Sequence, residues 1–159
     1  MLLSTELDSA KSYGDIFAII KKAVNRSLGV HRVGLMLYLG NLPIKVGAFH
    51  PVGTNDIVLN RRLLTAASKS NPKWKANAFS ILLHEYLHSL GYLDEKQVKG
   101  LTYRVCLENF GRKHPVVEAT VMGPWQNLSQ EEWETISSDF ELDLERVKDF
   151  ERIESGYII

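Results

Sequence analysis

The sequence has a single cysteine, no net charge and no long hydrophobic run. Cys106 has no partner for an intrachain disulfide, so we expect it to be a buried, small apolar residue. No apolar stretch approaches the roughly 20 residues that a helix needs to span a bilayer. Residues 1–10 lack the basic start and apolar run of a secretory signal peptide. These absences predict a cytoplasmic protein without disulfides or a membrane anchor.

The 159 residues are enough for one domain, and 45% of them are apolar, which is ordinary for a chain that buries a core. The charges are unevenly spread. Residues 1–128 contain 16 Lys and Arg against 9 Asp and Glu, whereas residues 129–159 contain 3 against 10. This asymmetry suggests either an acidic C-terminal helix docked on a basic body or a solvated acidic face.

The most informative motif is H-E-x-x-H at residues 84–88. On a helix, His84 and His88 project from one face about one turn apart, which places two imidazole nitrogens on one metal ion. Zinc is the usual metal for such a pair. Glu85 stands beside them, where a carboxylate can accept a proton from a metal-bound water. We therefore predict His84 and His88 as zinc ligands and Glu85 as the general base.

The residues around the motif predict a helix. Residues 74–90 contain no Gly or Pro and carry apolar side chains at close to helical spacing. Asn71 and Pro72 suit the first positions of a helix, and Gly91 suits its end. Gly91 can adopt a positive φ angle and turn the chain sharply out of the helix. Asp94, six residues after His88, then lies within reach of the same metal and is the expected third ligand.

The pattern H-E-x-x-H-x-x-G-x-x-D resembles the zinc signature of the metzincin metallopeptidases, of which a minority have Asp at the last position. Residues 121–125 (V-M-G-P-W) resemble the Met-turn of that clan, with Met122 at its centre. Residues 128–133 (L-S-Q-E-E-W) look like the start of its C-terminal helix. The resemblance spans roughly residues 55–145. It implies a zincin-like fold, a zinc cofactor and hydrolysis of peptide bonds.

Asp94 replaces the commoner His of this clan, so other third ligands stay open. In the gluzincin metallopeptidases the third ligand is a Glu on a later helix, and residues 115–120 can form such a helix turn around Glu118. The alternatives to Asp94 are therefore Glu118, Glu95 and His114.

The remaining patterns predict an α+β fold, in which a small mixed or antiparallel sheet packs on the zinc-binding helix between N-terminal and C-terminal helices. We expect helices at 12–28, 61–68 and 97–110, strands at 32–39, 45–49 and 57–60, and an acidic C-terminal helix that starts with a capping box at 129–132 and continues to about residue 150. The zincin resemblance implies an antiparallel edge strand that lines the cleft, within residues 48–60. A further hypothesis is that the apolar tail at 155–159 folds back onto that cleft.

The predicted function is a zinc-dependent peptidase acting on peptides or proteins. One alternative is a metal-dependent endoribonuclease, because residues 83–94 also resemble the H-G-x-L-H-L-x-G-Y-D-H signature of YbeY-type proteins. Glu85 stands where that family has Gly, and Leu93-Asp94 stands where it has Asp-His. Another alternative is a non-catalytic, zinc-stabilised module in which Glu118 or His114 fills the fourth metal position.

Overall fold

The computed structural model describes residues 2–43, 46–62, 72–123 and 144–151. Within these ranges the chain has an α+β fold, as the sequence predicts. The helices are α1 (Leu3–Ser9), α2 (Tyr13–Leu28), α4 (Pro72–Ser89), α5 (Glu95–Phe110) and α6 (Pro115–Met122), and the strands are β1 (Met36–Gly40), β2 (Ala48–Phe49), β3 (Asp56–Asn60) and β4 (Glu145–Arg146).

The four described strands form one mixed sheet in the order β2-β3-β1-β4. The central strands β1 and β3 run parallel, with Met36 opposite Asp56. Both outer strands are antiparallel to their neighbours, β2 to β3 and β4 to β1. Among the described strands, β2 is therefore an edge strand with one side unpaired, inside the range 48–60 where the sequence predicts such an edge.

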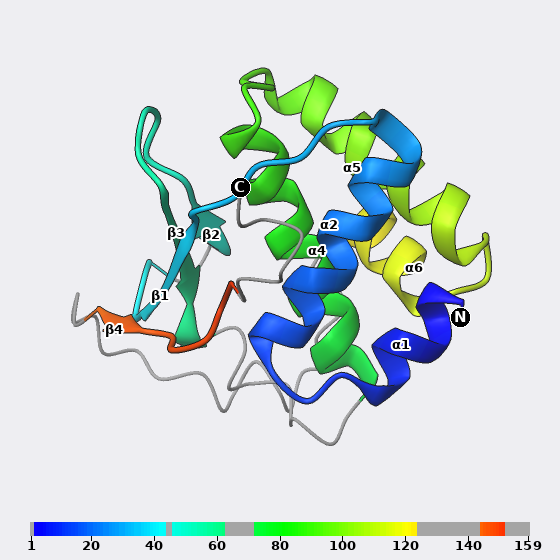
Figure 1. Cartoon of the computed structure of the whole chain (residues 1–159), viewed down its shortest axis with the longest axis horizontal. Helices are drawn as coiled ribbons and strands as arrows, with labels where there is room; N and C mark the ends of the chain where they lie inside the picture. Colours follow the sequence, from blue (N-terminus) through cyan, green and yellow to red (C-terminus); the bar gives the residue numbers. More distant parts are fainter. Residues whose placement is uncertain (1, 44–45, 63–71, 124–143, 152–159) are drawn as a thin grey trace, which may run out of the picture.

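Helix α4 lies at the centre of the molecule, between the sheet and the outer helices (Figure 1). It packs against α2, α5 and α6 and also against β2 and β3. Because α4 has neighbours on several sides, most of its length is apolar, and Tyr86 is fully buried within it. The Tyr86 hydroxyl accepts a hydrogen bond from the backbone N–H of Arg32 at 2.9 Å. The other fully buried large side chains of α4 are Phe79, Leu82, Leu83 and Leu87.

Local capping explains where the second helix begins and ends. The Ser12 hydroxyl accepts a hydrogen bond from the Asp15 N–H at 3.1 Å, and Gly29 ends α2 with φ at +69°. The predicted helix at 12–28 is thus confirmed. Helix α1 was not predicted, although Leu3 and Leu7, one turn apart, both bury against the core.

Two predicted strands are shorter than expected, because β1 starts only at Met36 and β2 only at Ala48. The predicted helix at 97–110 is confirmed and begins earlier, at Glu95. Residues 61–62 are helical, and residues 63–68 of that predicted helix lie outside the described residues.

The prediction that the C-terminal helix continues to residue 150 is wrong, because Glu145–Arg146 form strand β4. Tertiary contacts outweigh the helical spacing here. Phe150 stacks on Phe17 with ring centroids 4.3 Å apart, and the Glu151 carboxylate accepts a hydrogen bond from the Leu35 N–H at 2.8 Å. The capping box at 129–132, most of that helix and the tail at 155–159 lie outside the described residues.

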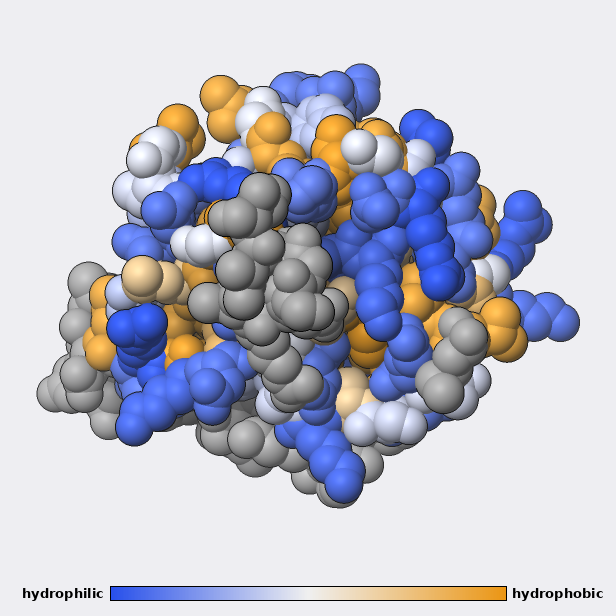
Figure 2. Space-filling view, in the orientation of Figure 1, coloured by the Kyte–Doolittle hydropathy of each residue, from blue (hydrophilic) through white to orange (hydrophobic). Residues whose placement is uncertain are grey.

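Hydrophilic side chains cover much of the face shown in Figure 2, with smaller apolar areas between them. No helix in the described ranges is both long and apolar enough to cross a membrane. The single cysteine, Cys106, is buried as predicted.

Candidate metal and catalytic site

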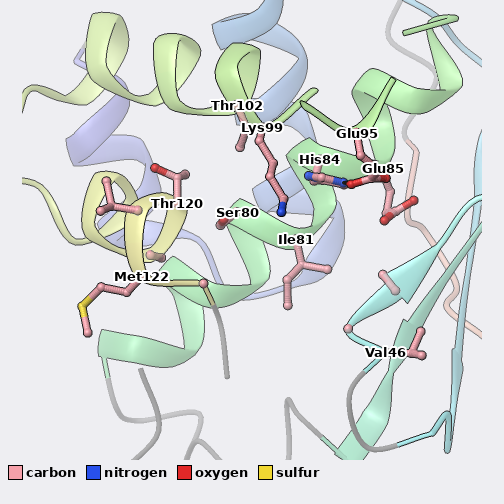
Figure 3. A pocket seen from close by; sticks show the side chains of 15 residues that line it. Val46, Ser80, Ile81, His84, Glu85, Glu95, Lys99, Thr102, Thr120 and Met122 are labelled. Atoms are coloured by element: carbon pink, nitrogen blue, oxygen red, sulfur yellow. Dashed lines mark hydrogen bonds and ion pairs between the residues drawn. The ribbon is translucent and has the colours of Figure 1, made fainter. Parts of the chain in front are cut away.

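Three side chains from two consecutive helices meet at one point. His84 and His88 come from the last turns of α4, and Glu95 is the first residue of α5. The two histidine Nε2 atoms are 3.2 Å apart. One Glu95 oxygen, Oε1, lies 2.6 Å from His88 Nε2, and the other, Oε2, lies 3.1 Å from His84 Nε2. Figure 3 shows Glu95 directly against the His84 ring.

The second nitrogen of His88 determines how its ring is oriented. Nδ1 lies 2.8 Å from the backbone carbonyl oxygen of Tyr92. A carbonyl only accepts, so Nδ1 carries the proton, and in the neutral ring Nε2 offers its lone pair. That lone pair faces a Glu95 oxygen, which is also an acceptor. The arrangement therefore requires a positive charge at its centre, either a shared proton or a metal cation.

The donor spacing suits a zinc ion. Zinc binds histidine nitrogen and carboxylate oxygen at about 2.0–2.2 Å in a tetrahedron, which places neighbouring donors about 3.3 Å apart. The nitrogen–nitrogen separation of 3.2 Å and one nitrogen–oxygen separation of 3.1 Å are close to that value, whereas the other nitrogen–oxygen separation, 2.6 Å, is shorter and is a hydrogen-bond distance. Among the described residues, His84, His88 and Glu95 form a group whose donor atoms all lie within 4.8 Å of one another.

The structure brings Glu95, and not Asp94, to the two histidines. Gly91 turns the chain out of α4 with φ at +105°, as the sequence predicts. Asp94 then caps α5, because its carboxylate accepts a hydrogen bond from the Gln97 N–H at 2.9 Å. The Asp94 carboxylate is thereby held at the first turn of α5. The next residue, Glu95, is the one that faces the two histidines.

The other two predicted alternatives also lie away from the group. Glu118 is exposed on α6. The Nδ1 atom of His114 accepts a hydrogen bond from the Val116 N–H at 3.1 Å, so this histidine caps α6. Burial lowers the His114 pKa, more than Asp8 raises it.

Glu85 is nearly buried, with 7% of its surface exposed. Burial raises its pKa to about 7; His88 lowers the pKa, and Glu95 raises it. The His84 pKa is lowered, mainly by burial, against the opposing effect of Glu95. Burial raises the pKa of Glu95, but His84 and His88 together outweigh that effect and lower it. A carboxylate with a pKa near neutrality can both accept and return a proton at physiological pH.

A cleft of about 710 Å³ opens beside these residues. Helix α4 forms its floor, α5 and α6 form one wall, and residues 46–48 at the start of β2 form the other. A smaller pocket of about 240 Å³ shares Ala48, Glu85 and Glu95 with this cleft. Its other lining residues are His50, His88 and the apolar side chains of Phe49, Val52 and Leu93. The group of donors therefore stands between a larger and a smaller space.

Met122, which the sequence places in a Met-turn, is the last residue of α6 and lines the larger cleft. Gly123 follows with φ at +82°, which supports a turn. Pro124 and Trp125, the rest of the predicted Met-turn, lie outside the described residues.

Sequence reasoning did not single out two residues on the cleft wall, Lys99 and Thr102. They follow Glu95 by four and seven residues on α5, so all three share one helix face. That spacing is a signal that could have found them once Glu95 was taken as a ligand.

Comparison with protein-family models, curated proteins and solved structures finds no match to this chain. Its function is therefore inferred from the residues of the site and their geometry.

Proposed function

We propose that this chain is a zinc-dependent peptidase, with His84, His88 and Glu95 as metal ligands and Glu85 as general base. One observation carries the proposal. Three side chains that could bind a metal converge beside a buried glutamate with a raised pKa, in a cleft bordered by β2, which is an edge strand among the described strands.

Zinc bound by two imidazoles and one carboxylate would supply an acidified water and an electrophile for a carbonyl oxygen. The residues around it supply the rest. The Tyr92 carbonyl holds the His88 ring in one tautomer, and Glu95 balances part of the charge. Glu85 would accept a proton and later return it to the leaving amine.

Strand β2 supports a peptide as the substrate. It is an edge strand among the described strands and lines both spaces beside the site, with Ala48 in the larger and Ala48 and Phe49 in the smaller. An extended peptide can add to such an edge through backbone hydrogen bonds. This combination of features is zincin-like, and a glutamate ligand from the following helix is closer to the gluzincin pattern than to the metzincin one.

The two alternative functions are less well supported. An endoribonuclease of the YbeY type has no need for the carboxylate of Glu85, yet that carboxylate lies at the cleft. A purely structural zinc site closes all four positions with protein ligands. The described residues gather three.

The test compares the zinc-loaded wild type with Glu85→Gln on casein, peptide pools and RNA, with zinc content measured by mass spectrometry. We expect one zinc per chain in both proteins and a loss of peptide hydrolysis of about 100-fold or more in the variant, the usual scale of general acid–base catalysis. Glu118→Gln, an exposed glutamate on α6, is the matched control and should keep wild-type activity. Undiminished hydrolysis by Glu85→Gln would refute the general base, and cleavage of RNA alone would favour the nuclease.

A further inference from the structure

Lys99 extends from α5 into the larger cleft. It lies on the same helix face as the metal-binding Glu95 and lines the cleft with Ser80 and Thr120. Figure 3 shows its side chain reaching from α5 toward Ser80 and Ile81 of α4, with the amino group directed into the space next to His84.

Lys99 lacks the partner that its position would normally provide. A Glu four residues before a Lys on a helix is well placed for an ion pair. Here both oxygens of Glu95 are engaged by His84 and His88 instead. Within the described ranges, no hydrogen bond or ion pair of Lys99 is found, so its positive charge faces the cleft.

The two sides of the site differ in chemistry. Apart from Glu85, Glu95 and the histidines His50 and His88, the smaller pocket is bordered by apolar side chains that favour an apolar group, namely Ala48, Phe49, Val52 and Leu93. On the other side, the larger cleft presents the ammonium of Lys99 next to the small polar side chains of Ser80 and Thr120. A ligand that spans the site therefore meets an apolar end and a cationic end.

We propose that Lys99 binds a carboxylate of the substrate, so that the cleft selects peptides carrying a negative charge close to the bond that is cut. The inference rests on the proposed peptidase function for its substrate, a peptide, but not on catalysis itself. Two sources share this chemistry, the C-terminal carboxylate of a peptide and the side chain of Asp or Glu. A lysine ammonium is a point charge on a flexible stem and can accept either one.

The experiment measures binding without turnover, using zinc-loaded full-length Glu85→Gln. The probes are random-sequence octapeptide pools in three forms: free C-terminus, amidated C-terminus, and amidated with Asp and Glu replaced by Asn and Gln. Recovered peptides are identified by mass spectrometry, and dissociation constants are then measured by fluorescence anisotropy for selected matched pairs. The same measurements are made on Glu85→Gln/Lys99→Gln. Glu85→Gln/Lys96→Gln is the control, because Lys96 is an exposed lysine of α5 that does not line the cleft.

We expect removal of the recognised carboxylate to weaken binding by about fivefold or more, the effect of one partly exposed ion pair. Lys99→Gln should abolish that difference, and Lys96→Gln should preserve it. If affinity falls on amidation alone, the recognised group is the C-terminal carboxylate. If affinity falls only when Asp and Glu are replaced, the recognised group is a side-chain carboxylate. Equal recovery of all three pools, or a difference that persists in Lys99→Gln, would overturn the inference.

The results that would refute the peptidase function differ from those that would refute the role of Lys99. If the protein with Glu85 intact binds acidic peptides in a Lys99-dependent manner but cleaves none of them, carboxylate recognition stands and the peptidase assignment falls. If it cleaves neutral and acidic peptides with equal kcat/KM, the peptidase assignment stands and the role of Lys99 is refuted.

Discussion

Asp94 and Glu95 are adjacent carboxylates with different tasks. Asp94 accepts a hydrogen bond from the Gln97 N–H and so starts helix α5. Glu95 faces the two histidine nitrogens. The sequence favours Asp94 as the ligand by its spacing from His88, but spacing does not show which of two neighbours a helix cap will engage.

Substitutions at Asp94 and at Glu95 should change the affinity for zinc to different extents. We expect Glu95→Gln to weaken zinc binding by about 100-fold or more, because it removes a charged ligand. Asp94→Asn should change the affinity by less than about threefold, because Asn caps helices as well as Asp does. Competition with a fluorescent zinc chelator at constant pH measures both. A larger loss in Asp94→Asn than in Glu95→Gln would restore Asp94 as the third ligand.

The raised pKa of Glu85 also has a consequence for stability. Its folded-state pKa of about 7 lies above the ordinary value of 4.5, so between those pH values the folded state binds more protons than the unfolded state. Stability therefore falls as the pH rises through this window, and the full cost of the buried charge is present above pH 7.

In zinc-free protein, Glu85→Gln should relieve that cost. We expect the variant to be more stable than the wild type at pH 8, by up to about 3 kcal/mol, with no advantage at pH 4.5. Urea unfolding at both pH values in the presence of a chelator measures the difference. An exposed glutamate changed in the same way, Glu118→Gln, should show no such pH dependence. A gain for Glu85→Gln that is equal at the two pH values would rule out charge burial as its cause.

At the scale of elements, the turn between α4 and α5 assembles the site. Gly91 has a positive φ angle, and the next residue, Tyr92, supplies the carbonyl that holds His88. Only after this reversal does α5 place Glu95 beside the end of α4. A short loop thus joins the two histidines at the end of α4 to Glu95 at the start of α5.

Two glycine-to-alanine changes should have opposite effects. At Gly91 an added Cβ would meet no atom within 4 Å, but the φ angle of +105° strains any other residue, so we expect Gly91→Ala to cost about 1–2 kcal/mol. At Gly100, inside α5, an added Cβ also meets nothing, and Gly100→Ala should stabilise the fold by about 0.5–1 kcal/mol. Thermal and urea unfolding measure both. Equal effects would show that the turn at Gly91 adapts without strain.

At the scale of the whole molecule, residues 147–151 hold the sheet to the helices. Glu151 accepts hydrogen bonds from the Leu35 N–H, next to β1, and from Lys21 of α2, each at 2.8 Å. The side chains of Lys21 and Glu151 are only 9% and 11% exposed. Gly14 of α2 lets this segment approach, because a Cβ there would lie 2.4 Å from the Asp149 carbonyl oxygen.

This ion pair should contribute measurably to stability. Glu151→Gln is expected to lower the free energy of unfolding by about 1–3 kcal/mol, because it removes the negative charge that the poorly solvated Lys21 faces at this position. Glu145→Gln is the control, since the Glu145 side chain is 70% exposed. Its ion pair with Arg61 should contribute less than about 0.5 kcal/mol to the free energy of unfolding. Similar losses in the two variants would refute the special role of Glu151.

Elements with their own start and stop signals could be predicted from the sequence. Helix α2 has Ser12 and Gly29 at its ends, and α4 has a long apolar pattern ended by Gly91. Strand β4 could not be predicted, because its residues follow a helical apolar spacing and become a strand through pairing with β1. That choice depends on contacts between residues far apart in the sequence.

The sequence by itself determined that two histidines and a glutamate share one end of a helix, because helical periodicity sets those positions. It also determined that the chain turns sharply at Gly91. Only the tertiary structure decided which carboxylate faces the histidines. It also decided that Glu95 contacts the histidines and not Lys99, whose side chain lies in the cleft. The physical reason is that a helix fixes the spacing of its own side chains, whereas the packing of α5 against α4 decides which of them meet.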